Sequence, residues 1–277
     1  HSCALRRDGA VLCWGDNGSG QLGDGTTVSR DQPRAVPGLT GVVELSLGSG
    51  KTCVRTADES VLCFGQTHGG GRAHSTAPVA MPALAGAAQL AVGMTHSCAK
   101  MGDGTVRCWG SNFRGQLGDG TTVDHLEPMP VPGLSGVEQV AVGAFSTCAR
   151  MLDETVRCWG YNGLGALGLD PSQEVVATPT QVPSLANVAH VAMGEFHRCV
   201  RRTDGLVLCW GGRYWSQIGD GVGGGDAEAL APQPVLLRTL PPVEQLAVGQ
   251  RHSCGLLPGG ALRCWGYNVG GGLGDGT

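Results

Sequence analysis

The chain has 277 residues, a formal net charge of −4 at pH 7, 48 glycines and 12 cysteines. This weakly acidic balance gives no general attraction to nucleic acid or to an anionic membrane, and no apolar run approaches the roughly 20 residues of a membrane-spanning helix. Glycine occurs without the three-residue period of collagen, so its abundance indicates many tight turns.

The stretch from Cys3 to Gly15 recurs six times along the chain, which predicts a repeat protein. Each copy holds two cysteines with nine residues between them, and no cysteine is left over. The six pairs are Cys3/Cys13, Cys53/Cys63, Cys98/Cys108, Cys148/Cys158, Cys199/Cys209 and Cys254/Cys264.

Each copy is predicted to form a β-hairpin. Two short apolar runs flank a turn signal such as Arg7-Asp8-Gly9, where glycine supplies the positive φ that a tight turn needs. With the turn centred on Asp8, Cys3 and Cys13 lie opposite each other on one face, and their Cβ atoms come close to disulfide distance. We therefore predict six hairpin disulfides.

Two alternatives to disulfides exist. Buried reduced thiols stay open because free cysteine is a common core residue, although six complete pairs favour bridges. A zinc site is disfavoured because structural zinc ligands are usually separated by two to four residues, and Cys-x-x-Cys occurs nowhere in the chain. Six disulfides indicate an oxidising location, which is extracellular, at the cell surface or periplasmic.

After each hairpin come a glycine-rich loop, a proline-rich link and a third apolar run. In the first copy these are Gly20 to Thr26, Val36 to Leu39 and Val42 to Leu47. The equivalent third runs are Ala88 to Val92, Val137 to Val142, Val188 to Met193 and Val243 to Val248. If the segment before each proline is an outer strand, every repeat supplies about four strands.

The hairpin strands are apolar on both faces, because Val11 and Cys13 point one way while Leu12 and Trp14 point the other. A sheet that is covered on both sides lies between two similar sheets. This predicts an all-β fold, a β-propeller with about six four-stranded blades present, in which residues 1–277 form a single repeat domain. A β-solenoid is the alternative, although its repeats are usually shorter.

The motif Cys-Trp-Gly-x-Asn-x-x-Gly-Gln-Leu-Gly-Asp-Gly-Thr, followed by Val-Pro-Gly-Leu and Val-x-x-Val-Ala-x-Gly, resembles the regulator of chromosome condensation repeat over essentially the whole chain. The cysteine-bearing hairpins are more similar to bacterial extracellular members than to the nuclear protein. The family usually forms seven blades. Because the chain starts at His1 and stops at Thr277 within repeats, we expect either nearly six blades of a seven-bladed ring or a six-bladed variant.

Motifs that suggest chemistry lack the context they need. The segments Gly18 to Gly23 and Gly163 to Gly168 match the dinucleotide fingerprint, but neither is predicted to open a helix that could hold a pyrophosphate. His1, His96, His197 and His252 each precede a cysteine by two residues, and a structural role is favoured over a metal site because metal ligands must converge. No catalytic motif is present, so we expect no enzyme, cofactor or metal.

The loops after Cys-Trp-Gly vary most between copies, and two copies are irregular. The second has Phe64 in place of Trp and a loop from Gln66 to Arg72, and the fifth is expanded from Val222 to Leu230. Aromatic and Arg side chains are favoured anchors at interfaces, although each could instead pack beneath a neighbouring blade. The candidate protein-binding residues are Phe113, Arg114, Tyr161, Arg213, Tyr214, Trp215 and Tyr267.

These observations favour a monomeric, non-enzymatic binding module, secreted or surface-displayed, with an unidentified protein partner. The resemblance allows two more specific functions: inhibitor of a secreted enzyme, and guanine-nucleotide exchange factor for a small GTPase. Exchange would require an inserted wedge, for which only Val222 to Leu230 is available, and six disulfides are out of place in the cytosol. An enzyme is the third class, because propellers also host active sites.

Overall fold

The computed structural model describes residues 1–66, 74–222 and 230–277. In these ranges every regular element is a β-strand except two single 3₁₀ turns, η2 (Pro82–Leu84) and η3 (Gly163–Gly165). No helix in the described ranges is long and apolar enough to cross a membrane. The chain divides into two compact units: unit 1 comprises 1–113 and 121–142, and unit 2 comprises 114–120 and 143–277.

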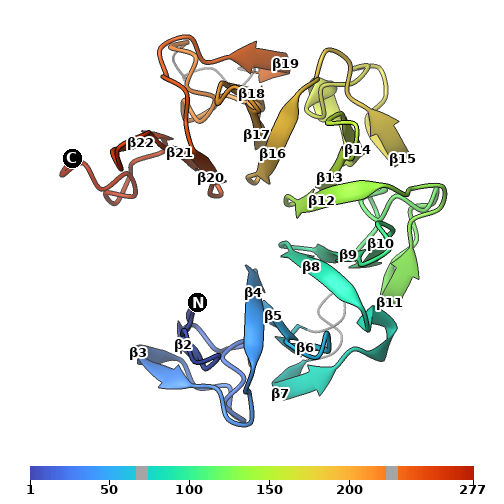
Figure 1. The fold of residues 1–277 in the computed structure, drawn as a ribbon, viewed down its shortest axis with the longest axis vertical. Coiled ribbons are helices and arrows are strands. Elements are labelled where there is room, and N and C mark those ends of the chain that lie inside the picture. Colours follow the sequence, from blue (N-terminus) through green and yellow to red (C-terminus); the bar gives the residue numbers. More distant parts are fainter. Residues whose placement is uncertain (67–73, 223–229) are drawn as a thin grey trace. The chain divides into compact units, whose positions relative to one another are not determined.

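Unit 1 contains three antiparallel sheets and the single strand β12 (Figure 1). The sheets have the strand orders β1-β2-β3, β4-β5-β6-β7 and β11-β10-β9-β8. The strands are β1 (Ser2–Leu5), β2 (Val11–Gly15), β3 (Arg30–Ala35), β4 (Val42–Gly48), β5 (Lys51–Thr56), β6 (Val61–Gly65), β7 (Ser75–Ala80), β8 (Ala87–Val92), β9 (His96–Met101), β10 (Val106–Gly110), β11 (His125–Pro130) and β12 (Val137–Val142).

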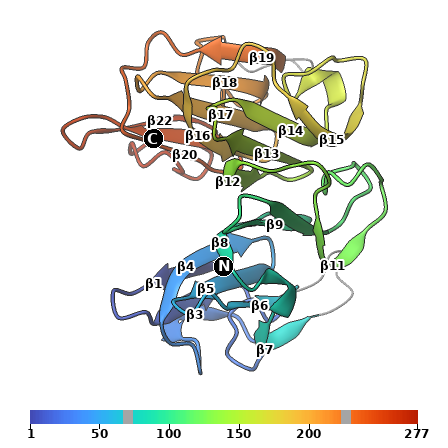
Figure 2. The same cartoon turned by 45° about the vertical axis from the view of Figure 1, so that its right-hand side comes forward.

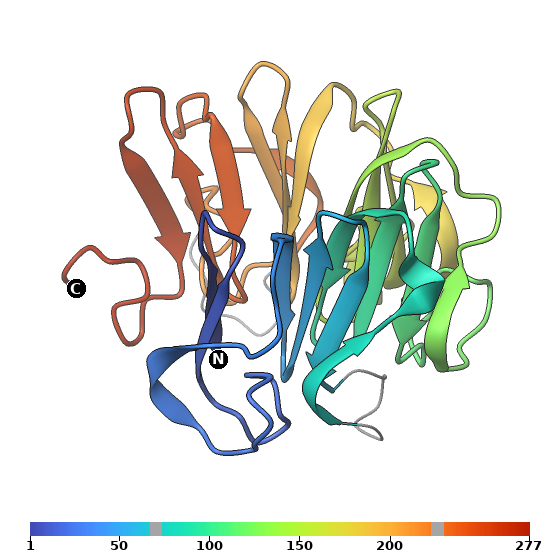
Figure 3. The ribbon, with the colours of Figure 1, turned by 60° about the horizontal axis from the view of Figure 1, so that its bottom comes forward.

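Unit 2 is built in the same way, with antiparallel pairing of β13, β14 and β15, then of β16 to β19, then of β20 to β22. In Figure 3 the strands of its last two sheets, coloured orange to red, run side by side within each sheet. The strands are β13 (Ser146–Met151), β14 (Val156–Tyr161), β15 (Val175–Gln181), β16 (Val188–Met193), β17 (His197–Arg202), β18 (Val207–Gly212), β19 (Leu230–Leu236), β20 (Gln245–Val248), β21 (His252–Leu256) and β22 (Leu262–Gly266).

Each sheet after the first begins one strand earlier than the repeat defined by the cysteine hairpin, because its first strand is the third apolar run of the preceding copy. The third apolar run pairs with the hairpin that follows it, so β4 pairs with β5, and both are drawn in blue in Figure 2. The segment before the proline pairs with the hairpin that precedes it, as β7 does with β6. The predicted outer strand is therefore confirmed.

The hairpins place the paired cysteines opposite each other, as predicted from the turn position. Cys3 pairs with Cys13 in the ladder of β1 and β2, and Gly9 adopts a φ of 80° at the turn. Where the repeat lacks this glycine, Glu59 and Glu154 take the same left-handed conformation, with φ of 63° and 62°. Disulfides join Cys3–Cys13, Cys53–Cys63, Cys98–Cys108, Cys148–Cys158, Cys199–Cys209 and Cys254–Cys264, and no cysteine is free.

The glycine of Cys-Trp-Gly ends the regular ladder and directs the chain into the loop. The pairing of β14 with β15 shifts register between Cys158 and Gly160, and Gly160 has a φ of 107°. A Cβ at Gly160 would lie 2.5 Å from the Phe145 carbonyl oxygen and 2.7 Å from the Ser146 Cα. Only glycine fits this bulge, because both the conformation and the space exclude a side chain.

Both faces of the central hairpins are buried, as the two-sided apolar pattern predicts. Cys158 and Trp159, on opposite faces of β14, are both fully buried. The Trp159 indole Nε1 donates a hydrogen bond to the Gln116 carbonyl oxygen at 3.0 Å, so the loop of one repeat covers the tryptophan of the next. This hydrogen bond holds the loop against the sheet and fixes the position of the loop backbone.

Candidate protein-binding surface

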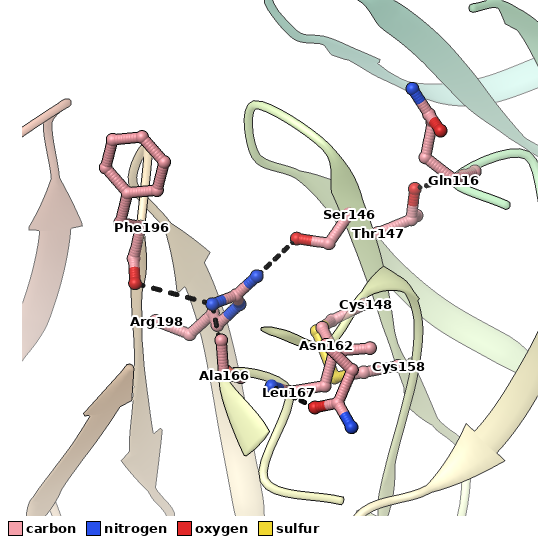
Figure 4. The surroundings of a disulfide bond; sticks show 10 residues. All are labelled: Gln116, Ser146, Thr147, Cys148, Cys158, Asn162, Ala166, Leu167, Phe196 and Arg198. Carbon is pink, nitrogen blue, oxygen red and sulfur yellow. Dashed lines mark hydrogen bonds between the residues drawn. A yellow bond between two sulfur atoms is a disulfide. The ribbon is translucent and has the colours of Figure 1, made fainter. Parts of the chain in front are cut away.

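An asparagine frames each standard loop after Cys-Trp-Gly, and it is buried in the first, third and fourth copies. In the fourth copy, Asn162 Oδ1 accepts a hydrogen bond from the Leu167 amide at 2.8 Å, and Asn162 Nδ2 donates to the carbonyl oxygens of Asp170 and Gln173 at 2.8 and 2.9 Å. Figure 4 shows the bond to Leu167 beside the Cys148–Cys158 disulfide. These bonds satisfy the loop backbone internally, so the residues at the tip are free to differ between copies.

A buried glutamine holds the backbone at the tip of the loop. Gln217 Oε1 accepts a hydrogen bond from the Trp215 amide at 2.7 Å, and Gln116 Oε1 accepts one from the Arg114 amide at 2.8 Å. Both glutamine side chains are buried. Arg114 and Trp215 therefore lie on a rigid backbone, which lowers the entropic cost of using their side chains in binding.

Arg213 occupies the asparagine position in the fifth copy, and like the asparagines it bonds to other residues of its own loop. Its Nη2 pairs with the Asp220 carboxylate, and its Nη1 donates to the Leu230 carbonyl oxygen at 3.3 Å. The side chains of Arg213 and Asp220 are only 19% and 6% exposed. Its position inside the loop separates Arg213 from the other candidate residues.

Tyr214, Trp215 and Tyr267 come together with Arg251 in unit 2, and we call these four residues the aromatic cluster. The ring centroids of Tyr214 and Trp215 are 5.8 Å apart, and so are those of Trp215 and Tyr267, both edge to face. The Arg251 guanidinium carbon lies 4.3 Å from the Trp215 centroid and 5.8 Å from that of Tyr267. All four are partly exposed.

Arg114 and Tyr161 form a second contact in the same unit. The Arg114 guanidinium carbon lies 4.9 Å from the Tyr161 ring centroid, and its Nη1 donates to the Glu174 carboxylate at 2.8 Å. Phe113 is 52% exposed and belongs to unit 1. The structure thus brings five of the seven predicted residues into two groups in unit 2, and it places Phe113 and Arg213 elsewhere.

A cavity of about 310 Å³ extends the surface from Tyr161 to Tyr214. Its lining also includes residues that were not among the sequence candidates: Phe145, Gly163, Ala166, Glu195, Phe196, Arg198, Gly212 and Leu230. Phe145, Phe196 and Arg251 occupy one variable column, two residues after the glycine of Val-x-x-Val-Ala-x-Gly. Comparison of that column between copies would have identified them.

Two of the histidines that precede the cysteines bond to a hydroxyl of the following repeat. His1 Nε2 lies 2.9 Å from the Thr52 hydroxyl oxygen, and His197 Nε2 lies 2.8 Å from that of Ser253. Burial, reinforced by the charge of Arg198, lowers the pKa of His197 to about 3. Within the described ranges no three His, Cys, Asp or Glu side chains are grouped to hold a metal ion.

Two irregular segments singled out in the sequence fall at gaps in the description. Most of the loop from Gln66 to Arg72 and all but the ends of the expansion from Val222 to Leu230 lie outside the described residues. The proposed wedge therefore stays a sequence-based prediction.

The chain is similar in sequence to parts of much larger proteins. The probable E3 ubiquitin-protein ligase HERC4 of Mus musculus is 33% identical over 110 residues, which are 38% of this chain and 10% of HERC4. The human E3 ubiquitin-protein ligase HERC2 is 46% identical over 54 residues, 19% of this chain and 1% of HERC2. The matched segments are thus a small part of either ligase.

Solved structures show the same fold. Prp20p of Saccharomyces cerevisiae superposes with a TM-score of 0.86 at 24% identity, covering 99% of this chain and 72% of Prp20p. Human WBSCR16 superposes with a TM-score of 0.77 at 21% identity, covering 94% of this chain and 75% of that protein. The predicted all-β propeller fold class is confirmed.

Models of the regulator of chromosome condensation (RCC1) repeat match most of the chain. One matches residues 8–55, 103–150 and 153–200, and a second matches 87–116, 137–166 and 243–271. These matches contain the complete hairpins Cys98–Cys108, Cys148–Cys158 and Cys254–Cys264, with the third apolar runs that precede them. The chain therefore belongs to the RCC1 repeat family.

Proposed function

We propose that this chain is a non-enzymatic protein-binding module whose partner contacts the aromatic cluster. The observation that carries the proposal is the pair of edge-to-face contacts that join Tyr214, Trp215 and Tyr267, with the Arg251 guanidinium 4.3 Å from the Trp215 ring centroid. Trp, Tyr and Arg are the residue types that contribute most binding energy at protein interfaces. Here they are partly exposed and held together on rigid loops.

The support beneath the cluster favours binding over simple packing. Arg251 Nε donates to the Glu195 carboxylate at 3.3 Å, and the Gln217 side chain fixes the Trp215 backbone. The side chains are therefore ordered before a partner arrives, which reduces the entropy lost on association. Arg114 and Tyr161 extend the proposed surface by a second cation–π contact.

The disulfides support a secreted or surface-displayed module, because such bridges persist in oxidising compartments. Inhibition of a secreted enzyme is one form that this binding could take. Prp20p is described as binding Gsp1p and histones, but at 24% identity the likeness to it concerns the fold alone. We favour a monomeric binding module over an exchange factor for that reason.

The test is quantitative affinity capture with the folded chain as bait. The bait is compared with the double variant Trp215→Ala and Tyr267→Ala and with the control Leu262→Ala, an exposed residue at the opposite end of β22 from Tyr267. We expect a secreted protein that the wild type and the control both retain and that the double variant loses. The purified partner should then bind the double variant at least tenfold more weakly.

Circular dichroism and the absence of alkylatable thiols verify that each bait is folded. If a folded double variant retains every protein that the wild type captures, the aromatic cluster is not the binding surface.

A further inference from the structure

Arg198 departs from the repeat in a way that the fold does not require. The residue before the first cysteine of each hairpin is Ser or Thr in the other five copies. There the Thr147 hydroxyl donates to the Gln116 carbonyl oxygen at 2.9 Å, and the Thr52 hydroxyl donates to that of Gln21 at 2.9 Å. Arg198 Nη1 makes the equivalent bond to the Ala166 carbonyl oxygen at 2.9 Å (Figure 4). A hydroxyl would therefore have been enough for this contact.

The sheet that contains Arg198 also lacks a hydrogen bond that neighbouring repeats make. Trp159 Nε1 and Trp265 Nε1 each donate to the carbonyl oxygen of the preceding loop's glutamine at 3.0 Å. Among the described residues, Trp210 Nε1 has no acceptor, and the matching oxygen of Ala166 is bonded to Arg198. A buried donor without an acceptor is destabilising, so the surroundings of Arg198 are not optimised for stability alone.

The guanidinium is a buried charge whose bonds go to neutral groups. Arg198 is 3% exposed, its Nη2 donates to the Ser146 hydroxyl at 2.6 Å, and its Nη1 also approaches the Phe196 carbonyl oxygen at 3.5 Å. In the part of the chain that the structure describes, Arg198 has no carboxylate partner and its Nε has no acceptor. Burial lowers the pKa of Arg198 to about 10, so it is still a cation at neutral pH. A buried cation is normally paired with an anion.

Arg198 lines the cavity of about 310 Å³, and the remaining walls are mainly apolar. The larger side chains around it are Phe145, Tyr161, Phe196, Tyr214 and Leu230. Glu195, the carboxylate in the lining, is already paired with Arg251 at 3.3 Å. The cavity thus combines an unpaired cation with aromatic walls and a volume suited to one small apolar group.

We propose that this cavity binds a carboxylate carried by an aromatic or aliphatic group, with Arg198 as the anion-binding residue. Arg binds carboxylates through charge-assisted hydrogen bonds, and the aromatic walls would take the apolar body of the ligand. The same chemistry is offered by a free aromatic acid and by the C-terminal residue of a peptide. This site does not depend on the aromatic cluster having a protein partner.

Isothermal titration calorimetry on the full chain tests the site with N-acetylphenylalanine and its neutral analogue, N-acetylphenylalaninamide. We expect the acid to bind and the amide to bind at least tenfold more weakly, because only the acid supplies a charge for Arg198. Arg198→Thr, which restores the residue found at position 147, should weaken binding of the acid at least tenfold. Leu262→Ala serves as the matched control and should leave it unchanged.

A second variant keeps the proposal testable if Arg198→Thr fails to fold. Phe145→Thr keeps Arg198 but replaces one aromatic wall of the cavity with the residue found at the matching position 95, and it should also weaken binding of the acid at least tenfold. Equal binding of acid and amide, no binding of the acid by the wild type, or unchanged binding in either folded variant would overturn the proposal.

The peptide acetyl-Gly-Gly-Phe separates the two sources of the carboxylate. Binding as tight as that of N-acetylphenylalanine identifies a peptide C-terminus, and binding at least tenfold weaker identifies a free small acid. Both results support the site. These titrations contain no protein partner, so a negative result does not bear on the proposed protein-binding function. Likewise, a negative affinity-capture experiment on the aromatic cluster does not bear on the acid-binding site.

Discussion

The Arg251 guanidinium lies 4.3 Å from the ring centroid of Trp215, although the two residues lie in loops of different sheets of unit 2. Trp215 follows β18 and Arg251 precedes β21. Their contact joins the loops of two successive sheets, so it links local loop structure to the packing between sheets.

This contact should make a measurable contribution to stability. In a double-mutant cycle of Arg251→Met and Trp215→Leu, we expect a coupling free energy of about 0.5–1 kcal/mol, typical of an exposed cation–π pair. Urea unfolding of the four proteins measures it. Strictly additive effects would show that the ring and the cation do not interact energetically.

Gly118 should be irreplaceable because of space as well as conformation. Gly118 has a φ of 75°, and a Cβ there would lie 2.6 Å from Trp159 Nε1. Gly120 is the matched control, since it has a φ of 85° but its Cβ would meet only Thr178 Cγ2, at 3.8 Å. We expect Gly120→Ala to lower the free energy of unfolding by about 1 kcal/mol and Gly118→Ala by about 2 kcal/mol more. Equal losses in urea unfolding would mean that Trp159 moves aside.

His197 should make the protein less stable in mild acid. Its pKa is about 3 in the folded chain, below the ordinary histidine value of 6.5, so below pH 6.5 the unfolded chain binds the extra proton and the free energy of unfolding falls. Between pH 7 and pH 5 this amounts to about 2 kcal/mol. His197→Gln should remove that part of the decrease in the free energy of unfolding. Above pH 7, plots of the free energy of unfolding against pH for the variant and the wild type, measured by urea unfolding, should be parallel. An unchanged acid slope would show that His197 is protonated without unfolding.

Each hairpin disulfide should stabilise the fold by restricting the unfolded chain. Cys148 and Cys158, both fully buried, close a short loop. Replacing both with Ala should lower the free energy of unfolding by about 2–3 kcal/mol. Alkylation and mass spectrometry of the unreduced wild type should find no free thiol. Free alkylation of its cysteines would contradict both the bridges and the oxidising location.

Glu154 occupies a turn conformation that suits glycine. Its φ is 62°, where the other copies have residues such as Gly205 with a φ of 82°. Glu154→Gly should raise the free energy of unfolding by about 0.5–1 kcal/mol, whereas Glu154→Ala should leave it nearly unchanged, because Ala has the same conformational cost as Glu. If both variants behave alike in urea unfolding, the turn carries no strain.

The binding candidates show where prediction from the sequence stops. Tyr214, Trp215 and Tyr267 could be selected because they break the repeat pattern at loop tips, and the structure brings them together. Arg213 broke the same pattern, yet it is paired with Asp220 inside the loop. Comparison of equivalent positions in the six copies identifies a residue that departs from the repeat, but the contacts of that residue depend on how the loop folds.

The sequence by itself determined the hairpins, the pairing of Cys3 with Cys13 and its five equivalents, and the family. These features depend on contacts between residues close in the chain, and six copies repeat the same signal. Only the tertiary structure placed Arg251 against Trp215, and Arg198 in a cavity with Tyr161 and Tyr214. Those contacts join residues from different repeats, and they depend on how side chains of neighbouring sheets pack, which no local pattern encodes.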